Sequence, residues 1–110
     1  MLFHPEKENP ALHCSDLFLD TKKHVCQVND TPISLTPTEF SILQILLENK
    51  GNVISGEALF HKIRKDEYYT KSSNTITVHI RRLREKLNDT LEHPKYIQTI
   101  WGVGYKIDEP

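Results

Sequence analysis

The residues best suited to chemistry are two adjacent arginines, Arg81 and Arg82, near the middle of the segment 74–87. Successive residues of an α-helix point about 100° apart, so one guanidinium can reach a base edge while the other reaches a phosphate. A guanidinium can donate two hydrogen bonds to guanine in the major groove, which discriminates against other bases by about 1–3 kcal/mol. The pair therefore predicts recognition of double-stranded nucleic acid.

The segment 74–87 has the pattern of an amphipathic helix. Its apolar residues are spaced by four, three and four, which predicts one buried stripe made of Ile76, Ile80, Leu83 and Leu87. The opposite face then carries Thr75, Thr77, Val78, His79, Arg81, Arg82 and Glu85. Val78 and the threonine methyls suit contact with thymine. Ser72 or Ser73 can cap the helix, whose N-terminus then favours a phosphate.

The charge distribution supports this interpretation, although a basic helix face is often simply solvated. The whole chain is nearly neutral, with 14 basic and 15 acidic side chains. Residues 61–86, however, hold eight basic and three acidic residues, a balance of +5, and the segments on either side are acidic. A near-neutral total therefore conceals one strongly basic segment.

The rest of the chain predicts the elements that position this helix. Four short runs separated by turn residues indicate an antiparallel meander: Leu12–Cys14, Leu17–Asp20, His24–Val28 and Pro32–Leu35. Thr36, Pro37 and Glu39 form the signature of a capped helix start, and the following apolar residues place that helix in the core. We expect it to end at Gly51, with Lys50 in its last turn.

A second helix is expected from a Ser55 cap to about Lys65, burying Leu59, Phe60 and Ile63. After the 74–87 helix come two strands, Tyr96–Trp101 and Tyr105–Asp108, joined by a glycine turn at 102–104. The predicted fold class is therefore α+β: a winged helix-turn-helix with an N-terminal four-stranded antiparallel sheet, three helices and a C-terminal β-hairpin wing. Residues 1–11 are interpreted as an interdomain linker or tail, and 12–110 as the winged-helix domain.

The hairpin offers Thr99, Trp101 and Lys106 near its turn. Such a wing can lie on the DNA backbone or enter the minor groove. Trp101 has an alternative interpretation as a core or hinge aromatic that packs against the 74–87 helix.

Three stretches together resemble the OmpR/PhoB family of response-regulator output domains: LTPTEFSILQILLENKGNVIS (35–55), NTITVHIRRLREKL (74–87) and YIQTIWGVGYKI (96–107). The shorter runs TPTEFSIL, ENKGNV, NTITVHIR and IWGVGYKI carry a narrower likeness to family members that regulate glycopeptide-resistance genes, which implies control of transcription in antibiotic resistance, as an activator. The resemblance implies double-stranded DNA as the ligand, bound head to tail by two copies on promoter direct repeats. It also implies a sensor kinase that acts through a receiver domain, which these 110 residues lack.

The resemblance also implies site residues. The DNA contacts of the family's recognition helix fall on Asn74, Thr75, Val78, His79, Arg81 and Arg82, and those of its wing fall on Thr99 and Trp101. The loop 64–73, which faces RNA polymerase or the next protomer in the family, holds Arg64, Lys65, Tyr68, Tyr69 and Lys71; a plain solvent loop is the alternative. The chain departs from the family at three places. Trp101 replaces the arginine common in the wing, and Ile63-Arg64-Lys65 replaces the Val-Trp-Gly often found at the end of the second helix. Asn74 replaces an arginine frequent at the start of the recognition helix.

Other function classes fit less well. The chain has no nucleophile elbow, glycine-rich phosphate loop or metal-ligand spacing, so we expect no enzyme activity, cofactor or metal. A winged helix that binds protein would have a mixed or apolar exposed face, and a non-specific nucleic-acid binder would be wholly salt-sensitive. Cys14 and Cys26 are expected as ordinary strand cysteines, with a cross-strand disulfide as the alternative. Without a membrane-length apolar stretch or a signal peptide, a cytoplasmic location is expected.

Overall fold

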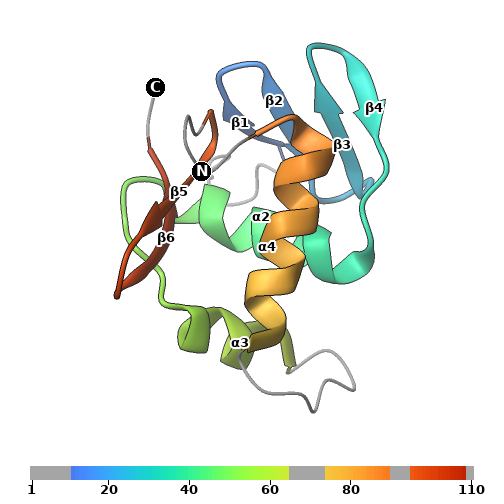
Figure 1. Ribbon diagram of the computed structural model, residues 1–110. Helices are drawn as coiled ribbons and strands as arrows, with labels where there is room; N and C mark the ends of the chain where they lie inside the picture. The colour runs from blue at the N-terminus through green and yellow to red at the C-terminus, as the bar shows by residue number, and fades with distance from the viewer. Residues whose placement is uncertain (1–10, 65–73, 90–94, 109–110) are drawn as a thin grey trace, which may run out of the picture.

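The computed structural model describes residues 11–64, 74–89 and 95–108. Within these ranges a four-stranded meander is followed by three helices and a two-stranded hairpin (Figure 1). The order of elements is the predicted one. Most of the predicted linker lies outside the described residues, and Ala11, its last residue, is the first residue of a strand.

The N-terminal sheet pairs its strands in sequence order, each antiparallel to the next, as predicted. Its strands are β1 Ala11–Cys14, β2 Leu17–Asp20, β3 Val25–Val28 and β4 Thr31–Ile33. Asn29 and Asp30 connect β3 to β4 with φ of 53° and 68°, and two positive φ angles are what a tight type I′ hairpin turn requires. His24, predicted to begin β3, has a φ of 61° and precedes the strand. The predicted fourth strand, 32–35, is also displaced, to Thr31–Ile33.

Helix α2 (Pro37–Glu48) begins as predicted. Glu39 N donates to Thr36 Oγ1 at 3.2 Å, and Thr36 N donates to Glu39 Oε1 at 3.0 Å, so the capping box is complete. The predicted end was two residues too late, because the helix ends at Glu48 with Asn49 as its C-cap. Lys50 therefore lies outside the last turn, and its Nζ donates to His13 O at 2.8 Å.

Helices α3 (Gly56–Arg64) and α4 (Asn74–Leu87) follow. Ser55 caps α3 as expected, since its Oγ accepts a hydrogen bond from Ala58 N at 3.0 Å. The bounds of α4 are the predicted ones, whereas its predicted serine caps lie outside the described residues.

The core is arranged around α2, which contacts β1, α3, α4 and β6. Figure 1 shows α2 in the middle of the molecule, behind α4 and between the four-stranded sheet and α3. Its buried apolar residues are Phe40, Ile42, Leu43, Leu46 and Leu47. The prediction that this helix is too apolar to lie on the surface is confirmed.

Strands β5 (Ile97–Ile100) and β6 (Gly104–Ile107) form the C-terminal hairpin. Ile54 extends this small sheet: Ile54 N donates to Tyr105 O at 2.8 Å, and Tyr105 N donates to Ile54 O at 2.9 Å. A Cβ atom on Gly104 would lie 2.2 Å from Ile54 O, so only glycine permits the two backbones to approach this closely. The turn between the strands is Trp101–Val103, one residue earlier than predicted.

Both cysteines are buried and free. Burial raises the pKa of the Cys26 thiol to about 11, so it is protonated at neutral pH. Among the described helices, none is both long enough and apolar enough to cross a membrane.

Candidate nucleic-acid interface

The apolar ridge of α4 determines which of its side chains face outward. Ile76, Ile80, Leu83 and Leu87 are all fully buried, as predicted. Because this ridge is fixed in the core, Arg81 and Arg82 emerge on the other side of the helix, and both are exposed. Neither guanidinium forms a hydrogen bond or ion pair within the part of the chain that the structure describes. Two adjacent positive charges are therefore held at the surface.

Val78 and His79 also belong to α4, and both are half-buried. Burial lowers the pKa of His79; the carboxylate of Glu39 opposes this shift, and the Arg82 guanidinium reinforces it. The imidazole is therefore neutral at pH 7, with one donor and one acceptor nitrogen. Asn74 and Thr75 form the first turn of α4, and their side chains lie outside the described residues.

The wing presents an apolar tip. Trp101 is 75% exposed and Val103 is 56% exposed, and both lie in the turn between β5 and β6. The interpretation of Trp101 as a core aromatic is therefore wrong, whereas a hinge role beside the 74–87 helix stays a prediction. Lys106, the hairpin cation noted in the sequence, pairs with Asp108 at 3.1 Å.

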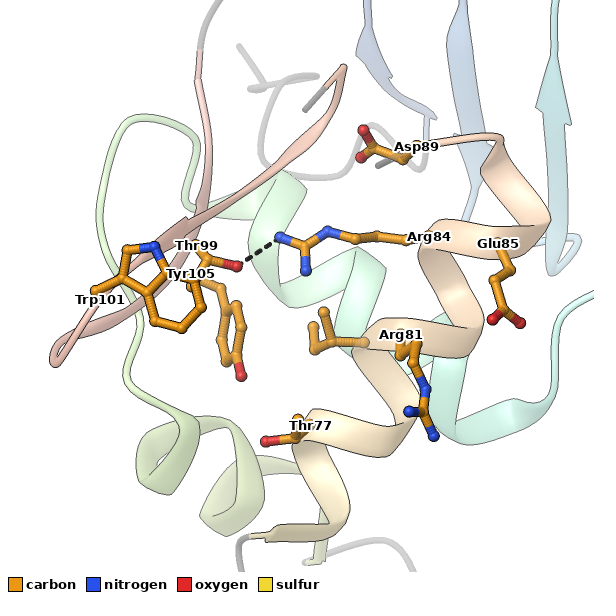
Figure 2. A pocket seen from close by; sticks show the side chains of 9 residues that line it. Thr77, Arg81, Arg84, Glu85, Asp89, Thr99, Trp101 and Tyr105 are labelled. Carbon is orange, nitrogen blue, oxygen red and sulfur yellow. Dashed lines mark hydrogen bonds between the residues drawn. The ribbon is translucent and has the colours of Figure 1, made fainter. Parts of the chain in front are cut away.

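A cavity of about 300 Å³ separates α4 from the wing. From the helix it is lined by Thr77, Ile80, Arg81, Arg84 and Glu85, and from beyond the helix by Asp89, Thr99, Trp101 and Tyr105. Figure 2 shows Trp101 and Tyr105 on the wing side and Thr77 and Arg81 on the helix side. Residues from the two predicted DNA-contacting elements thus meet at one crevice.

Arg84 crosses this crevice and was not singled out in the sequence, where it is one of eight cations of the basic segment. It is only 9% exposed. Its Nη2 donates to Ile97 O at 2.9 Å and to Thr99 Oγ1 at 2.7 Å, as the dashed line to Thr99 in Figure 2 shows. The helical period contained a signal for this position, because residue 84 follows Ile80 by four and falls beside the buried ridge.

Asp89 holds the strand that Arg84 contacts. Its carboxylate is buried and accepts hydrogen bonds from three consecutive backbone N–H groups, those of Lys95, Tyr96 and Ile97. Its own N–H donates to Arg84 O at 2.8 Å. The C-terminal end of α4 and the start of β5 are therefore joined at one buried carboxylate.

The predicted polymerase-facing loop is largely untested. Arg64 is the last residue of α3. Lys65, Tyr68, Tyr69 and Lys71 lie outside the residues that the structure describes.

The comparisons with known proteins agree with this arrangement. The family described as "Transcriptional regulatory protein, C terminal" matches residues 30–107, from the β3–β4 turn to the end of β6. The regulatory protein VanR of Enterococcus faecium is 62% identical over 104 residues, which are 94% of this chain and 45% of that protein. The chain thus spans less than half the length of this relative.

Solved structures share the fold. The response regulator DrrB of Thermotoga maritima, an OmpR/PhoB homolog, matches with a TM-score of 0.80 and 32% identity, covering 94% of this chain and 46% of that one. The DNA-binding domain of RstA from Klebsiella pneumoniae, solved in complex with the RstA box, matches with a TM-score of 0.78 and covers 89% of this chain and 96% of that one. Its 24% identity makes it evidence of fold alone.

These findings confirm the predicted fold class and the family resemblance. The match covers the capped α2, the exposed arginine pair of α4 and the β5–β6 wing. The chain therefore belongs to the family of transcriptional regulatory protein C-terminal domains, as a winged-helix DNA-binding domain of an OmpR/PhoB-type response regulator.

Proposed function

We propose that this domain binds a specific double-stranded DNA site, with α4 in the major groove and the β5–β6 wing on the adjoining backbone and minor groove. The observation that carries the proposal is the outward position of Arg81 and Arg82, which the buried ridge of α4 imposes. A major groove admits an α-helix, and paired guanidinium groups suit its guanine and phosphate acceptors.

The residues divide into two groups by the contacts they are suited to make. Arg82 is proposed to read a base, and Arg81, closer to the wing crevice, to contact backbone or base. Val78, His79, Asn74 and Thr75 complete the major-groove face. On the wing, Thr99 and Trp101 approach the minor groove, where an exposed indole offers apolar contact in place of a cation.

The regulated genes are proposed from sequence similarity. The identity of 62% to VanR of Enterococcus faecium supports a regulator of the same type, controlling glycopeptide-resistance genes by activating their transcription. In this proposal the domain acts in the cytoplasm, as the output half of a longer protein whose receiver domain responds to a sensor kinase.

Two macromolecular contacts are proposed in addition to DNA. Two copies bind head to tail on promoter direct repeats. The segment with Arg64, Lys65, Tyr68, Tyr69 and Lys71 contacts RNA polymerase or the neighbouring copy. Substitution of Tyr68 and Tyr69 should lower activation in a transcription assay at full DNA occupancy, and unchanged activation there would contradict the loop's role.

The experiment that tests DNA reading is selection of bound duplexes from a random pool at two salt concentrations. We expect one enriched motif, arranged as a direct repeat, at both concentrations. Phosphate contacts alone weaken steeply with salt and carry no sequence preference. If no motif is enriched and the amount of bound DNA falls as the salt concentration rises, the domain is a non-specific binder.

A further inference from the structure

Arg84 places a charged group in a buried position whose neighbours do not neutralise it by direct contact. Asp89 is close to it in sequence, but that carboxylate accepts three backbone N–H groups of residues 95–97 instead. Glu85 lies at the exposed side of the same turn. Within the described ranges, Arg84 therefore directs its side-chain hydrogen bonds to strand β5, through Ile97 O and Thr99 Oγ1.

The two acceptors are the backbone carbonyl oxygen of Ile97 and the side-chain hydroxyl of Thr99, two residues apart along β5. Thr99 of β5 and Trp101 of the turn that follows it both line the crevice beside α4. Arg84 thus binds β5 beside the crevice that Trp101 also lines.

The other strand of the wing is attached elsewhere. β6 is joined to Ile54 by the two backbone hydrogen bonds at Tyr105, and Gly51 N donates to Ile107 O at 2.8 Å. Among the described residues, β5 is bound at its start by Asp89, which follows the end of α4, and by the Arg84 side chain at Ile97 and Thr99. The Trp101–Val103 tip extends beyond these attachments. An apolar side chain at position 84 could fill space but could not bond to two acceptors, whereas a guanidinium is a planar, rigid donor.

We infer that Arg84 is a positioning residue, which fixes the wing against the recognition helix and so sets the offset between Trp101 and Arg81. The consequence for DNA binding rests on the proposed function: a wing that is ordered before binding loses less conformational entropy on the duplex. Arg84 acts here through Thr99 and the strand, and the indole of Trp101 is the group whose position it controls.

Trp101 is the only tryptophan of the chain, so its fluorescence reports on the wing without a label and without DNA. The first test is time-resolved anisotropy of Trp101 in the 110-residue chain and in Arg84→Met and Thr99→Val variants. We expect both variants to increase the amplitude of nanosecond indole motion while far-ultraviolet circular dichroism stays unchanged. Thr77→Val is the matched control, since Thr77 lines the same crevice and forms no bond with Arg84.

Thr99→Val decides the test if Arg84→Met does not fold, because valine keeps the shape of threonine and removes one acceptor of Arg84. Indole motion in Thr99→Val equal to that in the parent chain and in Thr77→Val would overturn the inference.

The second test is a double-mutant cycle on DNA affinity. Trp101→Ala should weaken binding to the selected duplex about fivefold to tenfold when Arg84 is present. In the Arg84→Met background the same change should have less than about a twofold effect, because the tip is no longer held in place. If the two substitutions each lower DNA affinity by the same factor in either background, Arg84 acts separately from the wing. If the chain selects no duplex at all, the proposed function fails, while the anisotropy comparison still decides whether Arg84 positions the wing.

Discussion

Lys86 Nζ lies 2.6 Å from Glu39 Oε1, and this ion pair joins the last turn of α4 to the first turn of α2. The same carboxylate oxygen accepts Thr36 N, so Glu39 caps one helix and binds the next. Burial by itself would raise the pKa of Glu39, but the hydrogen bonds from Lys86 and Thr36 outweigh it and lower the pKa from its ordinary value of 4.5. The recognition helix is thus anchored to the central helix by a carboxylate that is only 1% exposed.

Glu39→Gln should destabilise the domain by about 1–2 kcal/mol at pH 7, because the amide cannot replace a charge-assisted hydrogen bond. A carboxyl group whose folded pKa is lowered stabilises the fold fully above its unfolded pKa and loses that contribution as pH falls through the folded value. The difference between parent and variant should therefore shrink as pH falls below about 4.5. Urea unfolding at several pH values measures it. Glu57→Gln, at an exposed position of α3, should change stability little at pH 7. A pH-independent difference for Glu39→Gln would contradict the charge argument.

Gly104→Ala should destabilise the domain by about 2 kcal/mol or more, since the new methyl group meets backbone rather than a movable side chain. Its Cβ would lie 2.7 Å from Ser55 Cα as well as against Ile54 O, which forces β6 away from Ile54. Thermal unfolding measures the loss. Gly56→Ala is the control, because its nearest neighbour would be Tyr105 Cε2 at 4.0 Å, and it should be neutral or slightly stabilising in α3. Equal stability of the two variants would show that the close approach is unimportant.

Asp89→Asn should cost about 1.5–3 kcal/mol, because one side-chain oxygen becomes an NH₂ group facing a backbone donor. Urea unfolding compares it with Asp20→Asn. Asp20 also accepts two backbone N–H groups, those of Lys22 and Lys23 at 3.0 Å each, but does so at the surface and through one oxygen that asparagine retains. Asp20→Asn should therefore lower the free energy of unfolding much less than Asp89→Asn does. Similar losses of stability in the two variants would argue against a special role for the buried carboxylate.

Arg82→Ala should lower affinity for the selected duplex by about 1–3 kcal/mol and relax the preference at one base position. Fluorescence titration with the selected and a scrambled duplex measures both effects. Lys23→Ala removes an exposed cation from the β2–β3 turn and should change affinity little. Equal losses on the two duplexes would assign Arg82 to phosphate contact instead of base reading.

The 110-residue chain should be monomeric without DNA, bind one half-site weakly, and gain affinity on two direct repeats. Over the described ranges the exposed large hydrophobic residues are Val53, Trp101 and Val103, which form no long apolar seam between copies. Sedimentation with and without duplexes of one and two repeats checks this. A stable dimer in the absence of DNA would contradict it.

The sequence by itself determined the features whose causes are local. The capping box of Thr36 and Glu39 involves residues three apart, and the ridge of α4 repeats at the helical period, so both could be predicted without a fold. The exposure of Arg81 and Arg82 followed from that ridge. Most strand bounds shifted by one or two residues, because positive φ angles such as that of His24 are not visible in a hydrophobic pattern.

Only the tertiary structure decided how charged and small residues are used between elements. Arginine is usually found at the surface, yet Arg84 is buried. Its acceptors, Ile97 O and Thr99 Oγ1, lie 13 and 15 residues later in the sequence, and the hairpin brings them to α4. In the sequence Gly104 appeared to be a turn glycine. Glycine is required there because the backbone of Ile54, about 50 residues earlier, leaves no room for a Cβ atom. Contacts of this kind depend on packing between distant segments. Spacing can indicate that position 84 lies beside the buried ridge, but residue type and spacing do not identify the partners.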